Sequence, residues 1–549
     1  MTNAAIYLHP NGFDTSGKEL LGRHSAGESF LRGFLRHAEV DRFYFWNVTG
    51  RPQAEIEALV ARIQPPSRPV SWIGRTARGA LGQAGVLNVP MPEIDVEAWR
   101  RIPVGQTRYS LCGITHTTAT ARTMSIISNL LTAPLRDYDA LICTSSAVRA
   151  SVETQLDLVR EHTAREFGPR RHAEVHRTTI PLGVNVEDFT RTPEHRKAWR
   201  ERLDIPEDAL VVLYVGRFEV RTKMNPGLMA RALERAARRT GQPIYWVNSG
   251  WGVTPESEAD FHAQTRALCP SVHYRNVDGR QPDVRFSIWS VGDIFLSLSD
   301  NIQETFGLTP VEAMAAGLPS VVSDWNGYKD TVRDGIDGFR VSTLAPAAGM
   351  GGDLAYWLAN DWVSYQHYVG AAAQYTAVDL DHAERVLSDL ILNPDLRAHQ
   401  GANAQARARE VFDWKVIIPQ YQALWAEQNA RRAMATPEPA RMDPTRPDPF
   451  TLFANYPTRH LTRTDVVTLR PGLDWPGIQA RLAAPLATYS QFNRPTDAEV
   501  ETVIAHLTTQ GPTNVTALRA LVPGPRQNFL QRGLIWLMRH DVVMIRPVG

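Results

Sequence analysis

The 549-residue sequence is poor in the features that mark several classes of protein. It has only three cysteines, Cys112, Cys143 and Cys269, and their spacing excludes a cysteine metal site and indicates a reducing compartment. Its 59 basic and 58 acidic residues give a net charge of +1, so the chain as a whole has no electrostatic attraction to nucleic acid or to anionic membranes. It also lacks internal repeats and extended charge runs.

Long apolar segments and a leader peptide are missing as well. No apolar run approaches the ~20 residues that a membrane-spanning helix needs, and the amino terminus does not have the pattern of a signal peptide. These absences predict a cytoplasmic protein. The length predicts several domains, because a single hydrophobic core does not grow to this size.

The most informative segment is Glu304–Asp324, which reads ETFGLTPVEAMAAGLPSVVSD. It predicts a short helix with Thr309 as N-cap and Pro310 at the first helical position. Glu312 falls three residues after that cap, as in a capping box.

The same segment predicts where the helix ends and what its start can bind. Gly317 is expected to end the helix, and Ser320–Ser323 is predicted to form a short strand. The backbone N–H groups near Gly307 and Leu308 would lie at the positive end of the helix. A diphosphate is stabilised at such a position.

Glu304 and Glu312 admit three interpretations. Glu312 could serve only in the capping box, and a pair of carboxylates is also the catalytic set of a glycosidase. The turn and helical turn between the two glutamates would place the carboxyl groups farther apart than the ~5 Å of a retaining hydrolase. Two carboxylates that bind the two ends of one long ligand fit this spacing better.

The sequence from Glu304 through Pro319 resembles the signature of the retaining GT-B glycosyltransferases of the "group 1" type, family 4. That signature has two glutamates separated by seven residues, then small residues and Gly-x-Pro, as here. The resemblance covers roughly the first 430 residues and continues into three flanking segments, Asp293–Ser299 (DIFLSLS), Asn326–Tyr328 (NGY) and Asp334–Phe339 (DGIDGF).

The resemblance assigns roles to this segment. It implies that Glu304 contacts the hydroxyls of a donor sugar and that Glu312 accepts hydrogen bonds from the nucleotide ribose. It also places the turn of Phe306, Gly307 and Leu308 against the donor. The implied ligand is a nucleotide-diphosphate sugar.

A second polar cluster follows the apolar run Leu210–Val215, which predicts a buried parallel strand. Gly216 breaks this strand, and Arg217 and Lys223 follow at its carboxyl end, where open α/β sheets bind ligands. As isolated residues they would be solvated loop cations, but the resemblance implies that they hold the donor diphosphate. A guanidinium and an ammonium would stabilise a departing nucleoside diphosphate without a metal.

The amino-terminal half is expected to supply the acceptor side. Ala5–His9 predicts a first strand, and Gly22–Phe30 resembles the family's glycine-containing loop before the first helix, in which Gly27 would allow close approach to phosphate or sugar. Glu28 is either a further ligand contact or a solubilising charge. His116 follows an apolar strand and matches the family's histidine near the donor sugar.

Two further helix starts are predicted from their caps. Asn225 as N-cap and Pro226 as first residue predict a helix through about Arg239. Asp379–Asp381 has the form of a metal-binding Asp-x-Asp motif, but an amphipathic helix follows directly, so Asp379 is predicted to be its N-cap. We therefore expect no metal and no cofactor, with the nucleotide sugar as substrate.

The resemblance implies α/β architecture of the GT-B type, with two Rossmann-like domains facing a cleft, and the change in composition after Ala433 predicts a small carboxy-terminal domain. The aromatic-rich segment Leu344–Val378 departs from the family pattern, and we expect it to form a small packed cluster, with sugar stacking as the alternative. The predicted parts are an acceptor domain (1–192), a donor domain (208–405), a helical segment that crosses back (406–432), a Pro-rich linker (433–449) and an accessory domain (450–549).

The accessory domain is predicted to be winged-helix-like, with helices at Asp497–Leu507, Asn514–Leu521 and Gln527–Arg539 and a final strand at Val542–Ile545. DNA reading would need an exposed basic face, but the whole chain is nearly neutral, so we prefer a docking or self-association module. The candidate basic residues are Arg526, Arg532 and Arg539. The predicted core is Val503, Ile504, Leu507, Leu518, Leu521, Leu530, Leu534 and Ile535.

Together these patterns and the family resemblance imply a cytoplasmic, retaining, metal-independent glycosyltransferase of the hexosyltransferase type. It would transfer a sugar with α-linkage to a glycan, lipid or small-molecule acceptor and would form a homo-oligomer or bind a protein partner through 450–549. Nucleic acid is not an expected partner. The alternative is a regulator that responds to nucleotide sugars and binds DNA through its carboxy-terminal domain.

Overall fold

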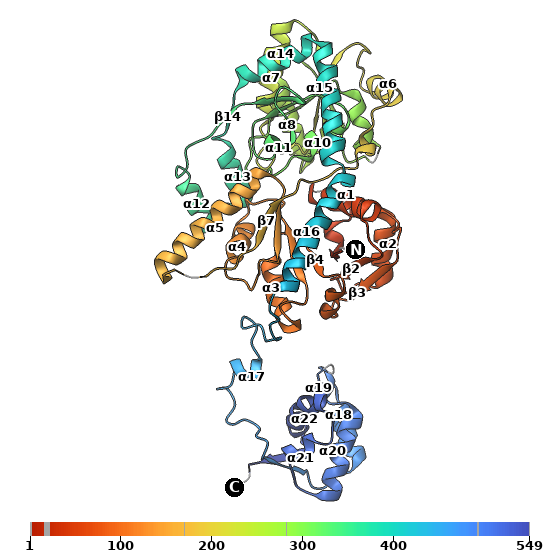
Figure 1. The fold of residues 1–549 in the computed structure, drawn as a ribbon, viewed down its shortest axis with the longest axis vertical. Helices are drawn as coiled ribbons and strands as arrows, with labels where there is room; N and C mark the ends of the chain where they lie inside the picture. The colour runs from red at the N-terminus through yellow and green to blue at the C-terminus, as the bar shows by residue number, and fades with distance from the viewer. Residues whose placement is uncertain (1–2, 16–21, 170, 282, 491–492, 548–549) are drawn as a thin grey trace. The chain divides into compact units, whose positions relative to one another are not determined.

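The computed structural model describes residues 3–15, 22–169, 171–281, 283–490 and 493–547. The chain forms two units, Met1–Pro444 and Thr445–Gly549, and the boundary between them falls inside the segment predicted as a linker. The first unit holds two α/β domains, each with its own sheet (Figure 1). Within the described ranges, no helix is both long and apolar enough to cross a membrane.

The first domain is built on a seven-stranded parallel sheet in the order β3-β2-β1-β4-β5-β6-β7. Its strands are β1 Ala5–Leu8, β2 Phe43–Asn47, β3 Val70–Ile73, β4 Val86–Asn88, β5 Ser110–Ile114, β6 Ala140–Cys143 and β7 His176–Thr179. Its helices are α1 Gly22–His37, α2 Gln53–Ile63, α3 Ile94–Arg101, α4 Ala121–Asn129 and α5 Ser146–Phe167. Every residue of β5 and β6 is buried, as expected of central strands in a covered parallel sheet.

The second domain has a six-stranded parallel sheet in the order β10-β9-β8-β11-β12-β13. Its strands are β8 Leu210–Val215, β9 Ile244–Gly250, β10 His273–Asp278, β11 Ile294–Ser297, β12 Ser320–Ser323 and β13 Gly338–Val341. Its helices are α6 Pro193–Arg202, α7 Pro226–Thr240, α8 Pro255–Ala267, α9 Val284–Ser287, α10 Leu308–Ala315, α11 Tyr328–Thr331, α14 Leu380–Leu392 and α15 Pro394–Arg407.

Both sheets have the doubly wound arrangement, which confirms the predicted pair of Rossmann-like domains. In each sheet the strand order reverses beside the first strand, between β1 and β4 and between β8 and β11. Ligands of such sheets bind outside the carboxyl ends of the strands at this reversal. A ligand site is therefore expected at the loops after β8 and β11.

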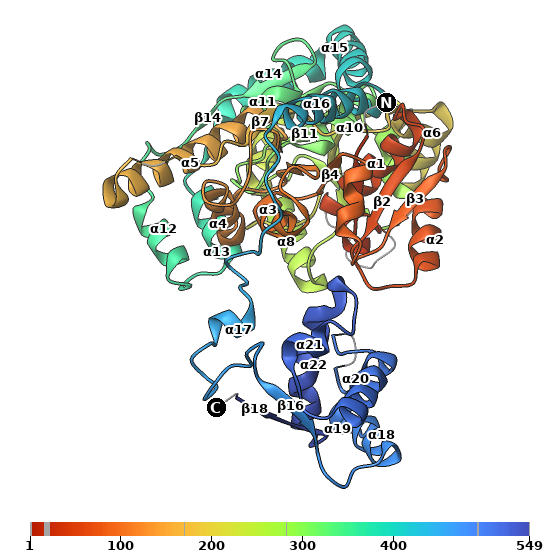
Figure 2. The ribbon, with the colours of Figure 1, turned by 60° about the horizontal axis from the view of Figure 1, so that its bottom comes forward.

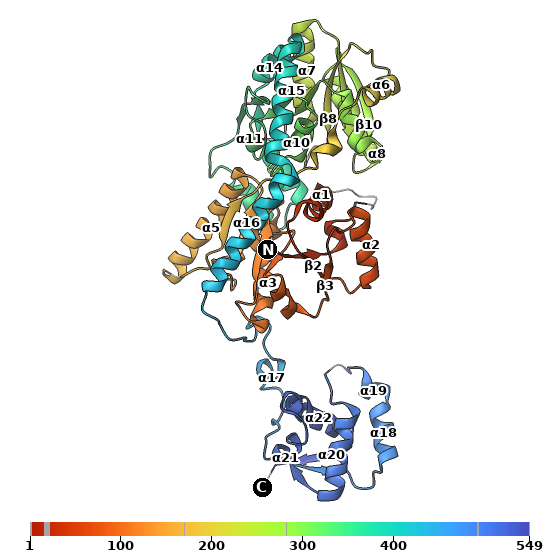
Figure 3. The ribbon, with the colours of Figure 1, turned by 45° about the vertical axis from the view of Figure 1, so that its right-hand side comes forward.

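A long helix, α16 Trp414–Met434, returns the chain to the first domain after the π-helical turn Ala408–Phe412. Figure 3 shows α15 and α16 running from one domain to the other. The indole of Trp414 donates to Ser29 Oγ at 2.7 Å, and the ring of Phe30 packs edge-on against it. The hydrophobic core is consequently continuous between α16 and the first sheet.

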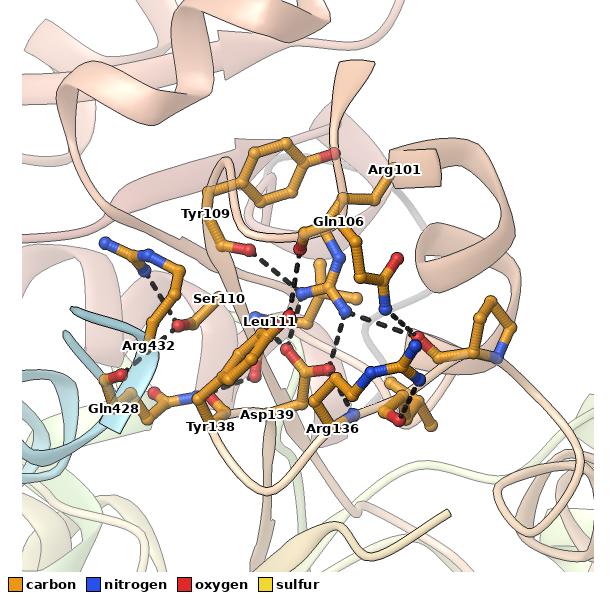
Figure 4. Close-up of polar contacts among 12 residues, drawn as sticks. Arg101, Gln106, Tyr109, Ser110, Leu111, Arg136, Tyr138, Asp139, Gln428 and Arg432 are labelled. Atoms are coloured by element: carbon orange, nitrogen blue, oxygen red, sulfur yellow. Dashed lines mark hydrogen bonds and ion pairs between the residues drawn. The ribbon is translucent and has the colours of Figure 1, made fainter. Parts of the chain in front are cut away.

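Buried polar groups hold the carboxy-terminal part of α16 against the first domain (Figure 4). Gln428 Nε2 donates to the carbonyl oxygens of Leu111 and Tyr138 at 2.7 and 3.0 Å. Beside them lies a fully buried ion pair, in which Arg101 donates to both carboxylate oxygens of Asp139 at 2.6 and 2.7 Å. The bidentate geometry supplies the partners that two buried charges need.

A separate lobe leaves the second domain between β13 and α14. Its neck is closed by β14 Thr343–Leu344, which pairs antiparallel with β15 Ala377–Val378. Between the two strands lie α12 Gly352–Ala359 and α13 Tyr365–Ala373. We call residues 343–378 the lobe.

The prediction of a packed aromatic cluster in this lobe is wrong. Helix α12 has no buried residue, and Tyr356, Trp362 and Tyr375 are 56%, 65% and 64% exposed. Only α13 has an inner face, formed by Val369 and Ala373. A single inner helix cannot cover the rings of the outer one, so they face solvent.

The second unit contains a three-stranded antiparallel sheet in the order β17-β16-β18, with β16 Val466–Leu469, β17 Thr513–Asn514 and β18 Val543–Arg546. The three predicted helices and the final strand are present, but the prediction did not include the central strand β16. Ile535, predicted in the core, is 50% exposed. The winged-helix interpretation stays a prediction. The helices of this unit are α17 Pro449–Leu452, α18 Trp475–Ala483, α19 Pro485–Thr488, α20 Asp497–Gln510, α21 Val515–Arg519 and α22 Gln527–Arg539.

Candidate functional site

The two polar segments singled out in the sequence follow the two strands that flank the reversal in the second sheet. Gly216, Arg217 and Lys223 come after β8, and Glu304 lies in the loop after β11. β8 and β11 are hydrogen-bonded neighbours, with Ile294 opposite Val212. The fold therefore brings these residues to one edge of the sheet.

Glu304 and Lys223 face each other across this edge. Lys223 Nζ lies 3.9 Å from Glu304 Oε2, and the two side chains are 29% and 21% exposed. This distance is at the outer limit of an ion pair, so both groups keep hydrogen-bonding capacity for a ligand. Glu304 Oε1 also accepts from the backbone N–H of Thr305 at 3.2 Å, which orients the carboxylate.

Arg217 is held loosely, by a 3.5 Å contact from Nη2 to Thr222 Oγ1. Among the described residues it takes part in no ion pair, so its charge is available to an anionic ligand. The loop that carries it is braced by Glu219, whose carboxylate accepts from the N–H groups of Arg221 and Thr222 at 3.0 and 2.6 Å.

Gly216 is required by close packing of the loops at the sheet edge. Its N–H donates to the carbonyl of Ser249 at 3.0 Å, and a Cβ atom on Gly216 would lie 2.5 Å from the Tyr214 hydroxyl. A Cβ atom on Gly250 would lie 1.8 Å from the Gly216 carbonyl oxygen. Two glycines thus let the loops after β8 and β9 meet.

Helix α10 begins differently from the prediction. Gly307, with a φ of +87°, is the N-cap, and Thr309 lies inside the first turn and hydrogen-bonds Tyr328. A Cβ atom on Gly307 would lie 2.1 Å from the Tyr328 ring, so both conformation and space demand glycine. No side chain caps this end, which leaves its N–H groups for an anion.

Glu312 does not form a capping box, because the helix starts two residues earlier than the cap at Thr309 implies. Burial raises the pKa of the Glu312 carboxyl to about 7, and the nearby charge of Arg285 only partly opposes this rise. Arg285 Nη1 in turn lies 3.2 Å from Glu28 Oε2 on α1 of the first domain. No local sequence pattern indicates Arg285.

Phe306, assigned to the donor by resemblance, has its side chain in the shared core. It is 1% exposed, and its ring packs against that of Phe412, with the centroids 6.0 Å apart. Only the backbone of Phe306 can therefore contact a ligand. Leu308, the first residue of α10, offers a backbone N–H in the same turn.

His116 lies on the loop after β5 of the first domain, and its Nε2 is 3.1 Å from the carbonyl oxygen of Pro90. The hydroxyl of Thr305 donates to the backbone carbonyl of His116. The Thr305 carbonyl accepts from Ser145 Oγ at 2.7 Å. Because Thr305 follows Glu304 directly, these bonds hold the loops of His116 and Glu304 together, a link that the sequence did not reveal.

Gly27 does not lie in a loop. It is inside α1, since the whole segment Gly22–Phe30 is helical. The prediction of a loop in this segment is wrong. A Cβ atom on Gly27 would lie 1.9 Å from the carbonyl oxygen of Gly12. Packing of α1 on the loop after β1 accounts for this glycine without a ligand.

The Asp379–Asp381 motif caps a helix, as predicted. The Asp379 carboxylate accepts from the backbone N–H groups of Asp381 and His382 at 3.0 and 2.9 Å, at the start of α14. In the part of the chain that the structure describes, no three His, Cys, Asp or Glu side chains are placed to hold a metal ion.

Residues 195–374 match the family described as "Glycosyl transferases group 1". The matched residues lie within the second domain. A D-inositol 3-phosphate glycosyltransferase from Streptomyces scabiei (strain 87.22) is 29% identical over 306 residues, 53% of this chain and 58% of that protein. A protein of the same name from Geodermatophilus obscurus is 30% identical over 190 residues, 34% of this chain and 41% of that protein. The matches thus span about half the length of these curated relatives.

Solved structures show the fold of the first unit. Anabaena Alr3699/HepE in complex with UDP is similar with a TM-score of 0.51 and 15% identity, over 78% of this chain and 100% of that one. Its complex with UDP and glucose gives a TM-score of 0.50, over 77% of this chain and 99% of that one. These likenesses confirm the two-domain GT-B fold.

Proposed function

We propose that the protein is a retaining glycosyltransferase that moves a sugar from a nucleoside-diphosphate donor to an acceptor hydroxyl with α-linkage. One observation carries this proposal. Glu304, Lys223, Arg217 and the uncapped start of α10 converge at the strand-order reversal of a group 1 glycosyltransferase domain.

The proposed roles follow from charge. Lys223, Arg217 and the first N–H groups of α10 would stabilise the negative charge that grows on the departing diphosphate, without a metal. Glu304, oriented by the Thr305 N–H, would bind donor-sugar hydroxyls. Glu312 would bind the ribose, and His116 would lie on the acceptor side of the sugar.

The relatives suggest which substrates to try first. HepE was solved with UDP, which supports UDP-sugars as donors. Relatives named D-inositol 3-phosphate glycosyltransferases support phosphorylated polyols among the small acceptors.

A transfer assay tests the proposal. The full chain should release UDP, GDP or ADP from a matching hexose donor, and the rate should be the same with and without EDTA. The proton coupling constant of the product's anomeric hydrogen should show the α configuration of the donor. A β-linked product would contradict retention, and activity that EDTA removes and Mg²⁺ or Mn²⁺ restores would contradict the metal-free mechanism.

For the second unit we propose docking or self-association in the cytoplasm rather than DNA reading. Arg526, one of the three candidate DNA contacts, is bound to Glu499 at 2.7 Å, and this arginine lowers the pKa of Glu499 to about 2. The guanidinium of Arg532 lies over the Phe529 ring. A gel-shift experiment with duplex DNA tests the choice, since salt-sensitive binding that needs 450–549 would favour the regulator.

A further inference from the structure

The lobe lies against the loop that carries the donor cations. A Cβ atom on Gly370 of α13 would be 3.2 Å from Arg221 Cβ, so α13 packs directly on this loop. Burial raises the pKa of Tyr365, the first residue of α13, and the nearby Thr117 and the charge of Arg217 partly oppose this rise. The inner helix of the lobe therefore lies beside the candidate site.

The lobe also reaches the first domain. Thr117 is the residue after His116, so Tyr365 lies near the loop on the acceptor side. Figures 1 and 2 both show α12 and α13 beside α4 and α5 of the first domain. A surface that starts at the site thus continues outward over the lobe.

The lobe carries several exposed aromatic side chains. Tyr356 and Trp357 on α12, Trp362 after it and Tyr375 after α13 are all exposed. The rings of Tyr356 and Trp362 meet edge to face, with their centroids 5.3 Å apart, so part of this surface has a fixed shape. Because α12 buries no residue, these rings do not serve a core. Clustered exposed aromatics of this kind mark binding surfaces.

The charges of the lobe restrict the ligand. Asp353 and Asp361 are the only charged residues in 343–378, and the segment has no lysine or arginine. Nucleic acids and anionic membranes, which are bound by basic residues, do not fit this surface. Carboxylate and amide groups beside aromatic rings, including Asn360, suit a ligand with many hydroxyl groups and apolar faces.

We propose that the lobe binds an extended, uncharged saccharide and directs one end of it past Tyr365 to the site. That this saccharide is the acceptor rests on the proposed function. The binding of this saccharide to the lobe is independent of the proposed function. The aromatic rings would stack on sugar rings along the chain, and Asn360 and Asp361 would bind hydroxyls between them.

The test compares two double variants of the full chain. Trp357→Ala/Trp362→Ala removes exposed rings from the lobe, and Phe450→Ala/Tyr489→Ala removes rings that are at least as exposed from the second unit. Maltohexaose, cellohexaose, chitohexaose, mannohexaose and free glucose are titrated by calorimetry. We expect one hexaose to bind more tightly than glucose, and the lobe variant to bind it about tenfold more weakly, the effect of losing two aromatic contacts. The control variant should bind it like wild type.

Other outcomes overturn the proposal. They are failure of all four hexaoses to bind, equal binding by the lobe variant, or a lobe-dependent binding to phosphatidylcholine vesicles in place of saccharide. Thermal stabilisation by UDP, GDP and ADP is measured on the same samples. Absence of nucleotide binding by the wild-type chain, with normal saccharide binding to the lobe, would contradict the proposed function alone. Normal nucleotide binding without saccharide binding to the lobe would contradict this inference alone.

Discussion

At the scale of single residues, two glutamates close in sequence have very different surroundings. Glu304 is half-buried beside Lys223, where a ligand can replace or join the existing contact. Glu312 is also partly exposed, but burial raises the pKa of its carboxyl to about 7, and the charge of Arg285 only partly opposes this rise. The first position suits a neutral sugar and the second suits a ribose whose hydroxyls donate to a carboxylate.

Glu304→Ala should abolish transfer with little change in melting temperature, because among the described residues the side chain has one distant ionic partner and one bond to a neighbouring N–H. We expect turnover to fall by about 100-fold or more, as when an enzyme loses a group that stabilises its transition state. Steady-state kinetics and a melting curve check this. Turnover above about a tenth of wild type would contradict the assigned role.

We expect Glu312 to make donor binding depend on pH. Since burial raises its pKa to about 7, the carboxylate is largely protonated at pH 6 and ionised at pH 8. Nucleoside-diphosphate affinity should therefore rise across this range, because the ionised form is the stronger acceptor for ribose hydroxyls. Calorimetry at pH 6, 7 and 8 measures the rise. Glu312→Gln should remove it, and a variant that keeps the wild-type rise would show that the nucleotide's own titration causes it.

The free energy of unfolding should depend on pH in the opposite direction to nucleotide affinity. A carboxyl whose pKa is higher in the folded chain than in the unfolded one favours folding at low pH. Its contribution decreases as pH rises from the ordinary glutamate pKa towards 7. Wild type should thus lose stability relative to Glu312→Gln between about pH 5 and 7 in the absence of nucleotide.

Sequence reasoning found the residues whose chemistry is explicit in a local pattern. Glu304, Arg217 and Lys223 each follow a predicted strand, and the structure brings them to one edge. Arg285 and Tyr365 were missed, because their relation to the site depends on contacts between segments far apart in the chain. No local pattern carries that information.

At the scale of elements, the start of α10 is the critical feature. Gly307 and Gly317, on either side of this helix, both have a positive φ, but only Gly307 has a neighbour within clashing distance of a Cβ atom. Alanine variants of the two glycines therefore distinguish the cost of backbone strain from the cost of a steric clash.

Gly317→Ala should cost about 1–2 kcal/mol of stability, the strain of a left-handed non-glycine residue. Gly307→Ala should cost more and should also weaken nucleotide binding, because the new Cβ atom displaces Tyr328 and the first turn of α10. Chemical denaturation and nucleotide titration of both variants check the difference. Equal nucleotide affinity in the two variants would contradict the role of the α10 start.

Elements with strong local signals were predicted well. The strands β8 and β12 have the predicted bounds, and Asn225 caps α7 as expected. The predicted start of α10 was wrong. The Thr-Pro pair is a good local cap, but Tyr328, distant in sequence, packs on Gly307 and fixes an earlier start. Strand β16 was missed because its partners β17 and β18 follow much later in the chain.

At the scale of the whole molecule, the chain divides into two units with separate cores. The segment before the boundary still belongs to the first unit, where Glu438 pairs with Arg136 at 2.8 Å and the N–H of Arg441 lies 3.4 Å from the Ile102 carbonyl oxygen. The natural place to end a shortened chain is therefore Pro444.

A chain ending at Pro444 should bind nucleotide like the full chain, because every residue assigned to the donor lies in the first unit. Its oligomeric state or its rate with the native acceptor should change, since these are the functions proposed for the second unit. Calorimetry and light scattering on both chains make the comparison. Loss of nucleotide binding in the shortened chain would show that the second unit completes the catalytic fold.

The central claim, that the reversal between β8 and β11 forms a nucleoside-diphosphate site, is tested most directly by calorimetric titration of UDP, GDP and ADP in EDTA. We predict that one of them binds with one-to-one stoichiometry and that Arg217→Ala and Lys223→Ala each weaken it by about 1.5–3 kcal/mol, the contribution of a charged hydrogen bond. Failure of all three nucleotides to bind wild type, or equal binding by wild type and both variants, would contradict it.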